Sequence, residues 1–159
     1  MGILEYLSPA GDLTYNINLG DMSEIILSPQ SDYWCAGNGE GCFTWNEAEN
    51  VSSITSNTCL SYLVLTFCEK YGFWLQYRSR KPQECEYISI GDGDFNHENA
   101  IEVYICGDSL LLPSAYFVSS AKALIAVEEF VTTANKSEEI KWCRKGEDRW
   151  DYGDPDGWT

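Results

Sequence analysis

Segments with a strand pattern follow one another at short intervals through the middle of the chain. Residues 60–67 are almost entirely apolar and β-prone, which predicts a central strand. Phe73, Leu75 and Tyr77 alternate with Trp74, Gln76 and Arg78. This period of two predicts a second strand, which pairs with the first as a hairpin. Residues 85–90 and 101–106 predict a third and a fourth strand. Because the connections between the four are short, the pattern predicts an antiparallel meander.

The first third of the chain also has strand patterns. Apolar and polar residues alternate over residues 13–19, and residues 24–27 read as the next strand. A glycine-rich stretch, residues 37–41, separates two aromatic runs at 33–35 and 42–45, which predicts a hairpin turn. A phosphate-binding loop is the alternative, but no Lys-Ser/Thr pair or helical pattern follows the glycines.

One segment has a clear helical pattern. Ser119 or Ser120 supplies the N-cap, and the helix is expected to end near residues 135–136. Spacings of three and four residues place one apolar stripe along it: Ala123, Leu124, Val127, Phe130, Val131 and Ala134. A short strand at residues 139–143 follows, with Ile140 and Trp142 on one face. We expect Trp142 to be a core residue beneath the helix.

These elements predict an α+β fold. A curved antiparallel β-sheet, built as a meander, carries one main C-terminal helix and ends in a short final strand. Residues 1–145 are expected to form a single domain, since the chain has 159 residues and neither a repeat nor a clear linker. Residues 146–159 form an acidic, aromatic-containing tail.

Charge is distributed unevenly along a strongly acidic chain. The formal net charge is −15, and residues 1–69 contain nine acids but no Lys or Arg. Phosphate binding depends on Lys and Arg, so we expect no direct binding to nucleic acid. The acidic surface could serve to attract a basic protein partner over long range, or it could serve solubility alone. The apolar stretches are shorter than the ~20 residues of a membrane helix.

The cysteines indicate a reducing compartment. There are seven, an odd number, with no C-x-x-C pair, and no secretion signal is visible at the N-terminus. Free thiols and a cytoplasmic location are therefore expected. A secreted disulfide scaffold is the alternative. Only one histidine is present, and no second cysteine pair complements Cys35 and Cys42 for zinc. We expect neither a metal nor a cofactor.

The stretch from Asp92 to Glu98 places acids at alternate positions, as a calcium loop begins. An EF-hand loop needs glycine at position six and glutamate at position twelve, where this chain has His97 and Val103. The segment therefore predicts a solvated connection, with a nonstandard cation site as the alternative. His97 could pair with a neighbouring acid, but no nucleophile pattern accompanies it. We assign no catalytic residues and expect no enzyme.

Aromatic residues mixed with acids are suited to binding a basic protein. Two segments combine acidity with the absence of a core pattern, namely the 92–98 stretch and the tail. The tail could equally fold back onto the sheet. The predicted partner-binding residues are Asp92, Asp94, Glu98, Asp148, Trp150, Asp151, Tyr152 and Asp154. If these fail, the acid-biased region around Asp32, Trp34 and Glu40 is the next candidate.

Residues 110–142 resemble the C-terminal signature of the "immunity protein one" family of bacterial polymorphic toxin systems. The similar features are an apolar segment with Pro113, a Val-Ser helix start, an amphipathic helix with an aromatic at Phe130, and a terminal strand with Trp142. Residues 87–94 and 101–104 resemble the family's hairpin strands. The resemblance covers roughly residues 60–143.

The resemblance implies a cytoplasmic protein that binds a cognate toxin domain, often a nuclease or a nucleic-acid deaminase. Inhibition would come from occlusion of the toxin's substrate cleft, with carboxylates where phosphates would lie. An acidic phage-type inhibitor or nucleic-acid mimic is the alternative function, followed by a small enzyme.

Overall fold

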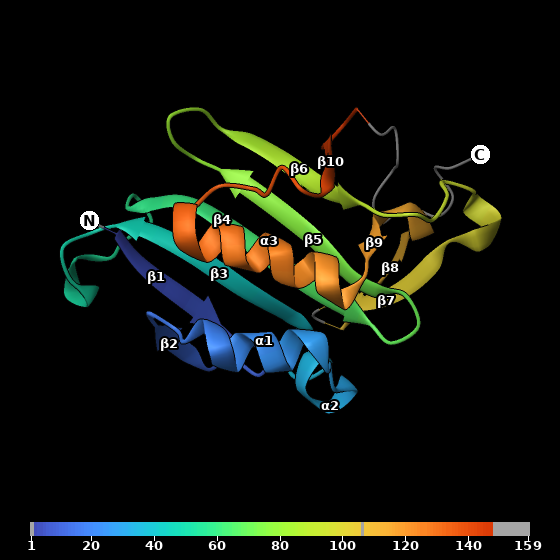
Figure 1. Ribbon diagram of the computed structural model, residues 1–159, viewed down its shortest axis with the longest axis horizontal. Helices are drawn as coiled ribbons and strands as arrows, with labels where there is room; N and C mark the ends of the chain where they lie inside the picture. Colours follow the sequence, from blue (N-terminus) through green and yellow to red (C-terminus); the bar gives the residue numbers. More distant parts are fainter. Residues whose placement is uncertain (1, 106, 148–159) are drawn as a thin grey trace.

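The computed structural model describes residues 2–105 and 107–147. The elements, in chain order, are β1 (Gly2–Leu7), β2 (Leu13–Tyr15), α1 (Leu19–Leu27), α2 (Ser31–Trp34), β3 (Glu40–Glu47), η1 (Val51–Ser53), β4 (Cys59–Cys68), β5 (Gly72–Ser79), β6 (Cys85–Ile90), η2 (His97–Asn99), β7 (Ile101–Ile105), β8 (Asp108–Leu112), η3 (Ser114–Tyr116), β9 (Phe117–Val118), α3 (Ser120–Thr133) and β10 (Lys141–Arg144). They form the predicted α+β fold (Figure 1).

An antiparallel sheet forms the centre of the molecule. Its strands lie in the order β10-β6-β5-β4-β3-β1-β2, and β9 pairs with β5. The predicted meander of β4, β5 and β6 is confirmed, and β4 is the central strand. Alternation holds as expected, since Phe73, Leu75 and Tyr77 all belong to the main core.

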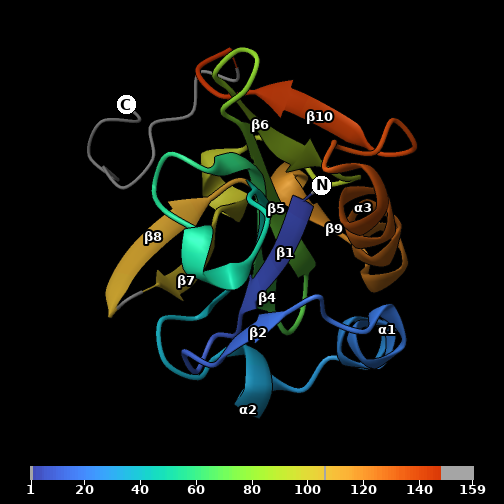
Figure 2. The ribbon, with the colours of Figure 1, turned by 90° about the vertical axis from the view of Figure 1, so that its left-hand side faces the viewer.

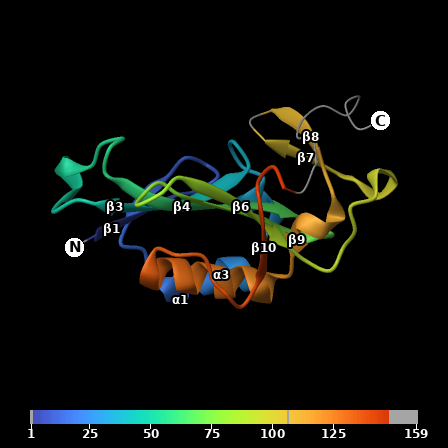
Figure 3. The ribbon, with the colours of Figure 1, turned by 90° about the horizontal axis from the view of Figure 1, so that it is seen from above.

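Helices α1 and α3 cover one face of this sheet, side by side (Figure 3). The predicted helix is confirmed in α3. Its N-cap is Ser119, whose hydroxyl accepts from the Lys122 amide at 3.2 Å. Ala123, Val127 and Phe130 are completely buried against the sheet. The helix ends at Ala134, which adopts a left-handed conformation with φ of 64°.

The final strand is present, but the structure corrects the environment of Trp142. Strand β10 pairs with β6 at the sheet edge, and Ile140 just before it is buried. Trp142 is only half-buried; its ring lies 6.3 Å from the ring of Tyr77. Its Nε1 donates to the Ser137 carbonyl at 2.8 Å. The edge position explains the partial exposure, because no other strand of the described residues pairs with β10 on its outer side.

The N-terminal strand predictions are wrong in two places. The alternating segment 13–19 forms a strand only over Leu13–Tyr15, because Asn16 adopts a positive φ of 51°. The segment 24–27 is the end of helix α1. Asn18 caps that helix, and Met22 and Ile26, four residues apart, are fully buried in the main core. The β-branched residues Ile25 and Ile26 favour a strand locally, but burial of Met22 and Ile26 on one face stabilises the helix instead.

The glycine-rich segment is not a hairpin turn. The preceding residues form the helical turn α2, and the glycines connect it to β3. Gly37 has a positive φ of 55°, and a Cβ there would lie 2.1 Å from the Pro9 carbonyl oxygen. Glycine is required because the loop packs directly against the backbone of another connection.

The fourth predicted strand exists as β7, but it does not join the meander. It pairs with β8 in a separate two-stranded sheet, which lies on the face opposite the helices (Figure 2). Ile101 and Val103 are buried as expected, and Glu102 and Tyr104 are exposed. A second core cluster forms beneath this β7–β8 ribbon, from residues that include Trp74, Val103 and Leu112.

Candidate partner-binding site

The order of the strands places the acidic and the basic parts of the sequence at opposite edges of the sheet. Strands β1 and β2, which carry no Lys or Arg, form one edge together with α1 and α2. Strands β6 and β10 form the other. Most described Lys and Arg residues lie on or beside that second edge: Arg78, Arg80, Lys81, Lys136, Lys141, Arg144 and Lys145.

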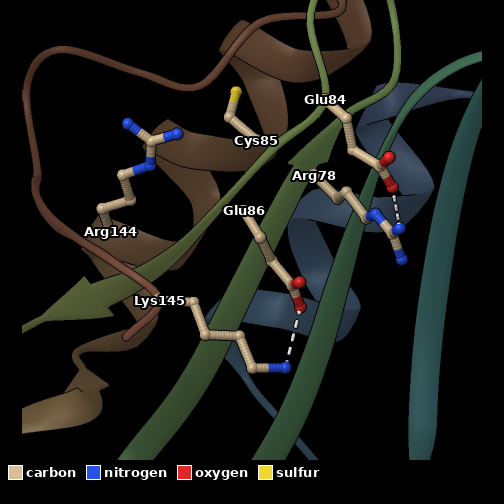
Figure 4. A pocket seen from close by; sticks show the side chains of 6 residues that line it. All are labelled: Arg78, Glu84, Cys85, Glu86, Arg144 and Lys145. Atoms are coloured by element: carbon tan, nitrogen blue, oxygen red, sulfur yellow. Dashed lines mark hydrogen bonds and ion pairs between the residues drawn. The ribbon is translucent and has the colours of Figure 1, made fainter. Parts of the chain in front are cut away.

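The basic edge is largely neutralised by its own acids. Arg78 forms an ion pair with Glu84, and Lys145 with Glu86 at 3.2 Å (Figure 4). The Arg78 guanidinium lowers the pKa of the Glu84 carboxyl, and the same hydrogen bond raises the pKa of Arg78. The cavity between them has a volume of about 290 Å³. Four of its charged side chains are joined in these two ion pairs, so apart from Arg144 it offers little free charge to a partner.

The acidic edge contains a groove that is different in kind. It lies between the 8–12 connection, β2, α1 and α2, with a volume of about 370 Å³. Asp12 and Asp32 supply its carboxylates, while Ile17, Ile25 and Tyr33 supply apolar and aromatic surface. No Lys or Arg is among the residues that line it.

Two tyrosines form the polar floor of this acidic groove. The hydroxyls of Tyr6 and Tyr33 lie 2.7 Å apart and share a hydrogen bond. Burial raises the pKa of both phenols, and the nearby Asp12 carboxylate raises that of Tyr33 further. Both rings therefore stay neutral near pH 7, and the carboxylates are the charged groups of the groove.

Local sequence explains why these side chains meet. The short helix α2 begins at Ser31, so Asp32 lies in its first turn, where the helix dipole favours an acid. The connection that holds Asp12 is closed by a hydrogen bond from the Asp12 amide to the Ser8 hydroxyl at 3.0 Å. The acidic groove is thus built from two local turns, the 8–12 connection after β1 and helix α2 before β3.

The structure places the predicted acids of the 91–99 connection away from this groove. The connection lies at the right-hand end of the molecule in Figure 1, far from α1 and β2. Asp92, Asp94 and Glu98 are all exposed there. The Asp94 carboxylate accepts from the Asn96 amide at 3.0 Å and from Asn99 Nδ2 at 3.4 Å, so it holds the loop together.

This connection is an ordered part of the fold. The Gly91 amide donates to the Ala115 carbonyl at 2.6 Å, and the Ala115 amide donates to the Asp94 carbonyl at 3.0 Å. A Cβ at Gly93 would lie 2.5 Å from the Ser114 backbone. In the part of the chain that the structure describes, no group of three or more His, Cys, Asp or Glu residues could hold a metal ion.

The predicted tail residues Asp148, Trp150, Asp151, Tyr152 and Asp154 lie outside the described residues. In the region named as the next candidate, Asp32 belongs to the acidic groove, whereas Trp34 is a buried core residue. Sequence reasoning did not single out Asp12 or Tyr33. The only sequence feature that pointed to them was the presence of acids and the absence of Lys and Arg in residues 1–69, which does not single out any one residue.

The described cysteines are half-buried, apart from Cys35, which is exposed. Cys35, Cys42, Cys59, Cys68, Cys85 and Cys143 are all free thiols. Burial raises the pKa of Cys42 to about 11 and also raises those of Cys59, Cys68 and Cys143. Such thiols are protonated near pH 7, which is the opposite of what an activated nucleophile needs.

Comparison of the chain with protein-family models and with curated proteins finds no match. Among the described residues, no helix is long and apolar enough to cross a membrane.

Proposed function

We propose that this chain is an immunity protein, which binds a cognate basic toxin domain in the cytoplasm and blocks its active site. The toxin domain would be a nuclease or a nucleic-acid deaminase. The observation that supports the proposal is the acidic groove, which combines two carboxylates with apolar and aromatic walls on an edge without Lys or Arg.

A protein that handles nucleic acid binds its polyanionic substrate with Lys and Arg. Those same side chains are complementary to Asp12 and Asp32. The net charge of −15 would draw such a partner in over distances of about the Debye length, ~8 Å at physiological ionic strength. Carboxylates of this chain would then occupy positions that phosphates take in the substrate complex.

The walls of the acidic groove supply the short-range part of the interaction. Lys and Arg have aliphatic stems that pack on apolar surface while their charged heads stay polar. Ile17 and Ile25 offer that surface, and Tyr33 adds an aromatic ring with a neutral hydroxyl. Aromatic side chains are enriched at the centres of protein interfaces. Acids would therefore set the association rate, and the apolar walls would slow dissociation.

The test is protection against, and binding to, the toxin domain encoded beside this chain's gene. Co-expression should restore growth of cells that express the toxin domain. Stopped-flow association should be measured at two salt concentrations for the parent chain and two charge-matched variants. One is Asp12→Asn with Asp32→Asn in the acidic groove; the other is Asp92→Asn with Glu98→Gln in the 91–99 connection.

We expect the groove variant to associate several-fold more slowly with a weaker salt dependence, and the loop variant to behave like the parent. The reverse result would overturn the groove and favour the loop acids predicted from sequence. Failure of the parent chain to bind or protect would overturn the proposed function itself.

A further inference from the structure

Three polar side chains form one row across the face of the sheet that the β7–β8 ribbon covers. Glu40 in β3 is the register partner of Thr66 in β4, and Thr66 is the partner of Trp74 in β5. Cross-strand partners project to the same face, with neighbouring strands about 4.8 Å apart. Trp74 belongs to the core cluster beneath the ribbon, which places the whole row on that side.

None of the three has its hydrogen-bonding capacity used. Thr66 Oγ1 and Trp74 Nε1 are buried without a hydrogen-bond partner among the described residues, in side chains only 2% and 3% exposed. The Glu40 carboxylate is half-buried, with neither a hydrogen bond nor an ion pair to any described residue. Desolvation raises the pKa of Glu40, as expected of a carboxylate without a partner. Buried polar groups in native proteins are almost always paired, so two buried unpaired atoms in one row with a half-buried unpaired carboxylate point to a ligand.

Open space lies on both sides of β7, next to this row. One cavity, of about 560 Å³, is lined by Glu40, Trp74 and Asp108 among others. The second, of about 320 Å³, is lined by Thr66, Glu69 and Glu102 among others. Neither lining includes a Lys or Arg. The charge of both cavities is therefore complementary to a cation.

We infer that the Glu40–Thr66–Trp74 row binds an arginine of the basic partner, by its guanidinium and its main-chain carbonyl together; this rests on the proposed function. Guanidinium N–H groups donate to the Glu40 carboxylate and to Thr66 Oγ1. The indole Nε1 of Trp74 can only donate, so it requires an acceptor, which the peptide carbonyl supplies. Arginine fits better than lysine, because its planar fork donates to two acceptors at once and stacks on aromatic rings.

Thr66 Oγ1 and Trp74 Nε1 are both buried. Entry of the ligand therefore requires the β7–β8 ribbon to move away from the sheet. The ribbon forms its own two-stranded sheet and has no strand pairing with the main sheet. It can therefore move without breaking the ladder of the main sheet. Two-stranded ribbons are also only marginally stable by themselves.

The experiment is a titration of ¹⁵N-labelled protein with N-acetyl-arginine amide at constant ionic strength, followed by NMR of the indole N–H signals. Trp74→Phe identifies the Trp74 signal, and Thr66→Val keeps the side-chain shape while removing the hydroxyl. The Trp74 signal should shift saturably with N-acetyl-arginine amide. N-acetyl-glutamine amide, which keeps the carbonyls but lacks the cation, should leave it in place.

Glu40→Gln should weaken binding of the arginine amide about tenfold or more, because it removes a charge-assisted hydrogen bond. Glu49→Gln, the same change at an exposed glutamate elsewhere, is the matched control and should bind as the parent does. An unmoved Trp74 signal, or equal affinity in Glu40→Gln, overturns the inference. Equal binding of N-acetyl-lysine amide overturns the choice of a guanidinium.

Titration with the toxin domain separates this inference from the function on which it rests. A toxin domain that binds without moving the Trp74 signal overturns the row as its arginine site and leaves the proposed function standing. A toxin domain that does not bind overturns the proposed function, whatever the response to the arginine amide.

Discussion

The indole Nε1 of Trp45 donates a hydrogen bond of 2.7 Å to the main-chain carbonyl of Phe130, although the two residues are 85 positions apart. The same carbonyl accepts from the Ala134 amide at 2.8 Å at the end of the helix. The last turn of α3 is thus tied directly to β3. A side chain from the N-terminal half of the chain thereby fixes where the C-terminal helix sits.

Replacing this indole tests that tie. Trp45→Phe keeps an aromatic ring but removes the donor, so the free energy of unfolding should fall by about 1 kcal/mol. Urea denaturation measures the change. Hydrogen exchange at the amides of the last turn of α3 should also become faster. Unchanged exchange there would show that the bond does not hold the helix end.

The N-cap of α3 can be tested with two adjacent serines. Ser119→Ala removes the hydroxyl that accepts from the Lys122 amide, which should cost about 1 kcal/mol of stability. Ser120→Ala is the matched control, because Ser120 is the first helical residue and its side chain caps nothing. Thermal or urea unfolding of both variants is the measurement. Equal effects of the two changes would contradict the cap.

Truncation of Trp142 should destabilise the chain less than a fully buried tryptophan would. Its indole is half-buried, contacts Tyr77 and donates to the Ser137 carbonyl. Trp142→Ala should therefore cost about 3 kcal/mol, the lower end of the usual range for core tryptophans. Trp142→Phe should cost less, since most of the ring contact remains. If the alanine variant unfolds like the parent, the contacts of Trp142 do not contribute to the stability of the main core.

Glu40 makes stability depend on pH in a definite direction. Burial raises the pKa of Glu40 above its ordinary 4.5, so the folded chain binds this proton more tightly than the unfolded chain does. This contribution favours folding at low pH and is lost as pH rises through the folded pKa. At pH 7 the desolvated carboxylate therefore opposes folding.

Glu40→Gln should consequently raise the free energy of unfolding at pH 7, and the gain should shrink as pH falls to about 4. Urea unfolding at the two pH values measures it. Glu49→Gln, a change at an exposed acid, should show no such gain. A variant no more stable than the parent at pH 7 would mean that the Glu40 carboxylate has an undetected stabilising partner.

The sequence by itself was sufficient for the elements whose signals are local. The three-strand meander of β4, β5 and β6 follows from period-two alternation and short connections, and α3 follows from its cap and apolar stripe. Such patterns act within about ten residues, so they do not depend on the rest of the chain. The acid-only character of residues 1–69 was likewise visible at once.

Tertiary structure decided the rest, because the deciding contacts join distant segments. Met22 and Ile26 stabilise α1 as a helix by their burial against the sheet and α3, whereas its local signals are only the Asn18 cap and the four-residue spacing of these two side chains. The β7 strand pairs with its sequence neighbour β8 and not with the main sheet, and the connection that leads into it from β6 is held on η3, twenty residues further along.

The acidic groove has the same origin. Its carboxylates, Asp12 and Asp32, belong to separate turns, and they meet only because the β1–β2 hairpin takes the edge of the sheet and α2 folds beside it. The sequence determined that its first part would be acidic. Strand order decided that these acids would share one edge, because side chains distant in sequence become neighbours only when long-range strand pairing brings their backbones together.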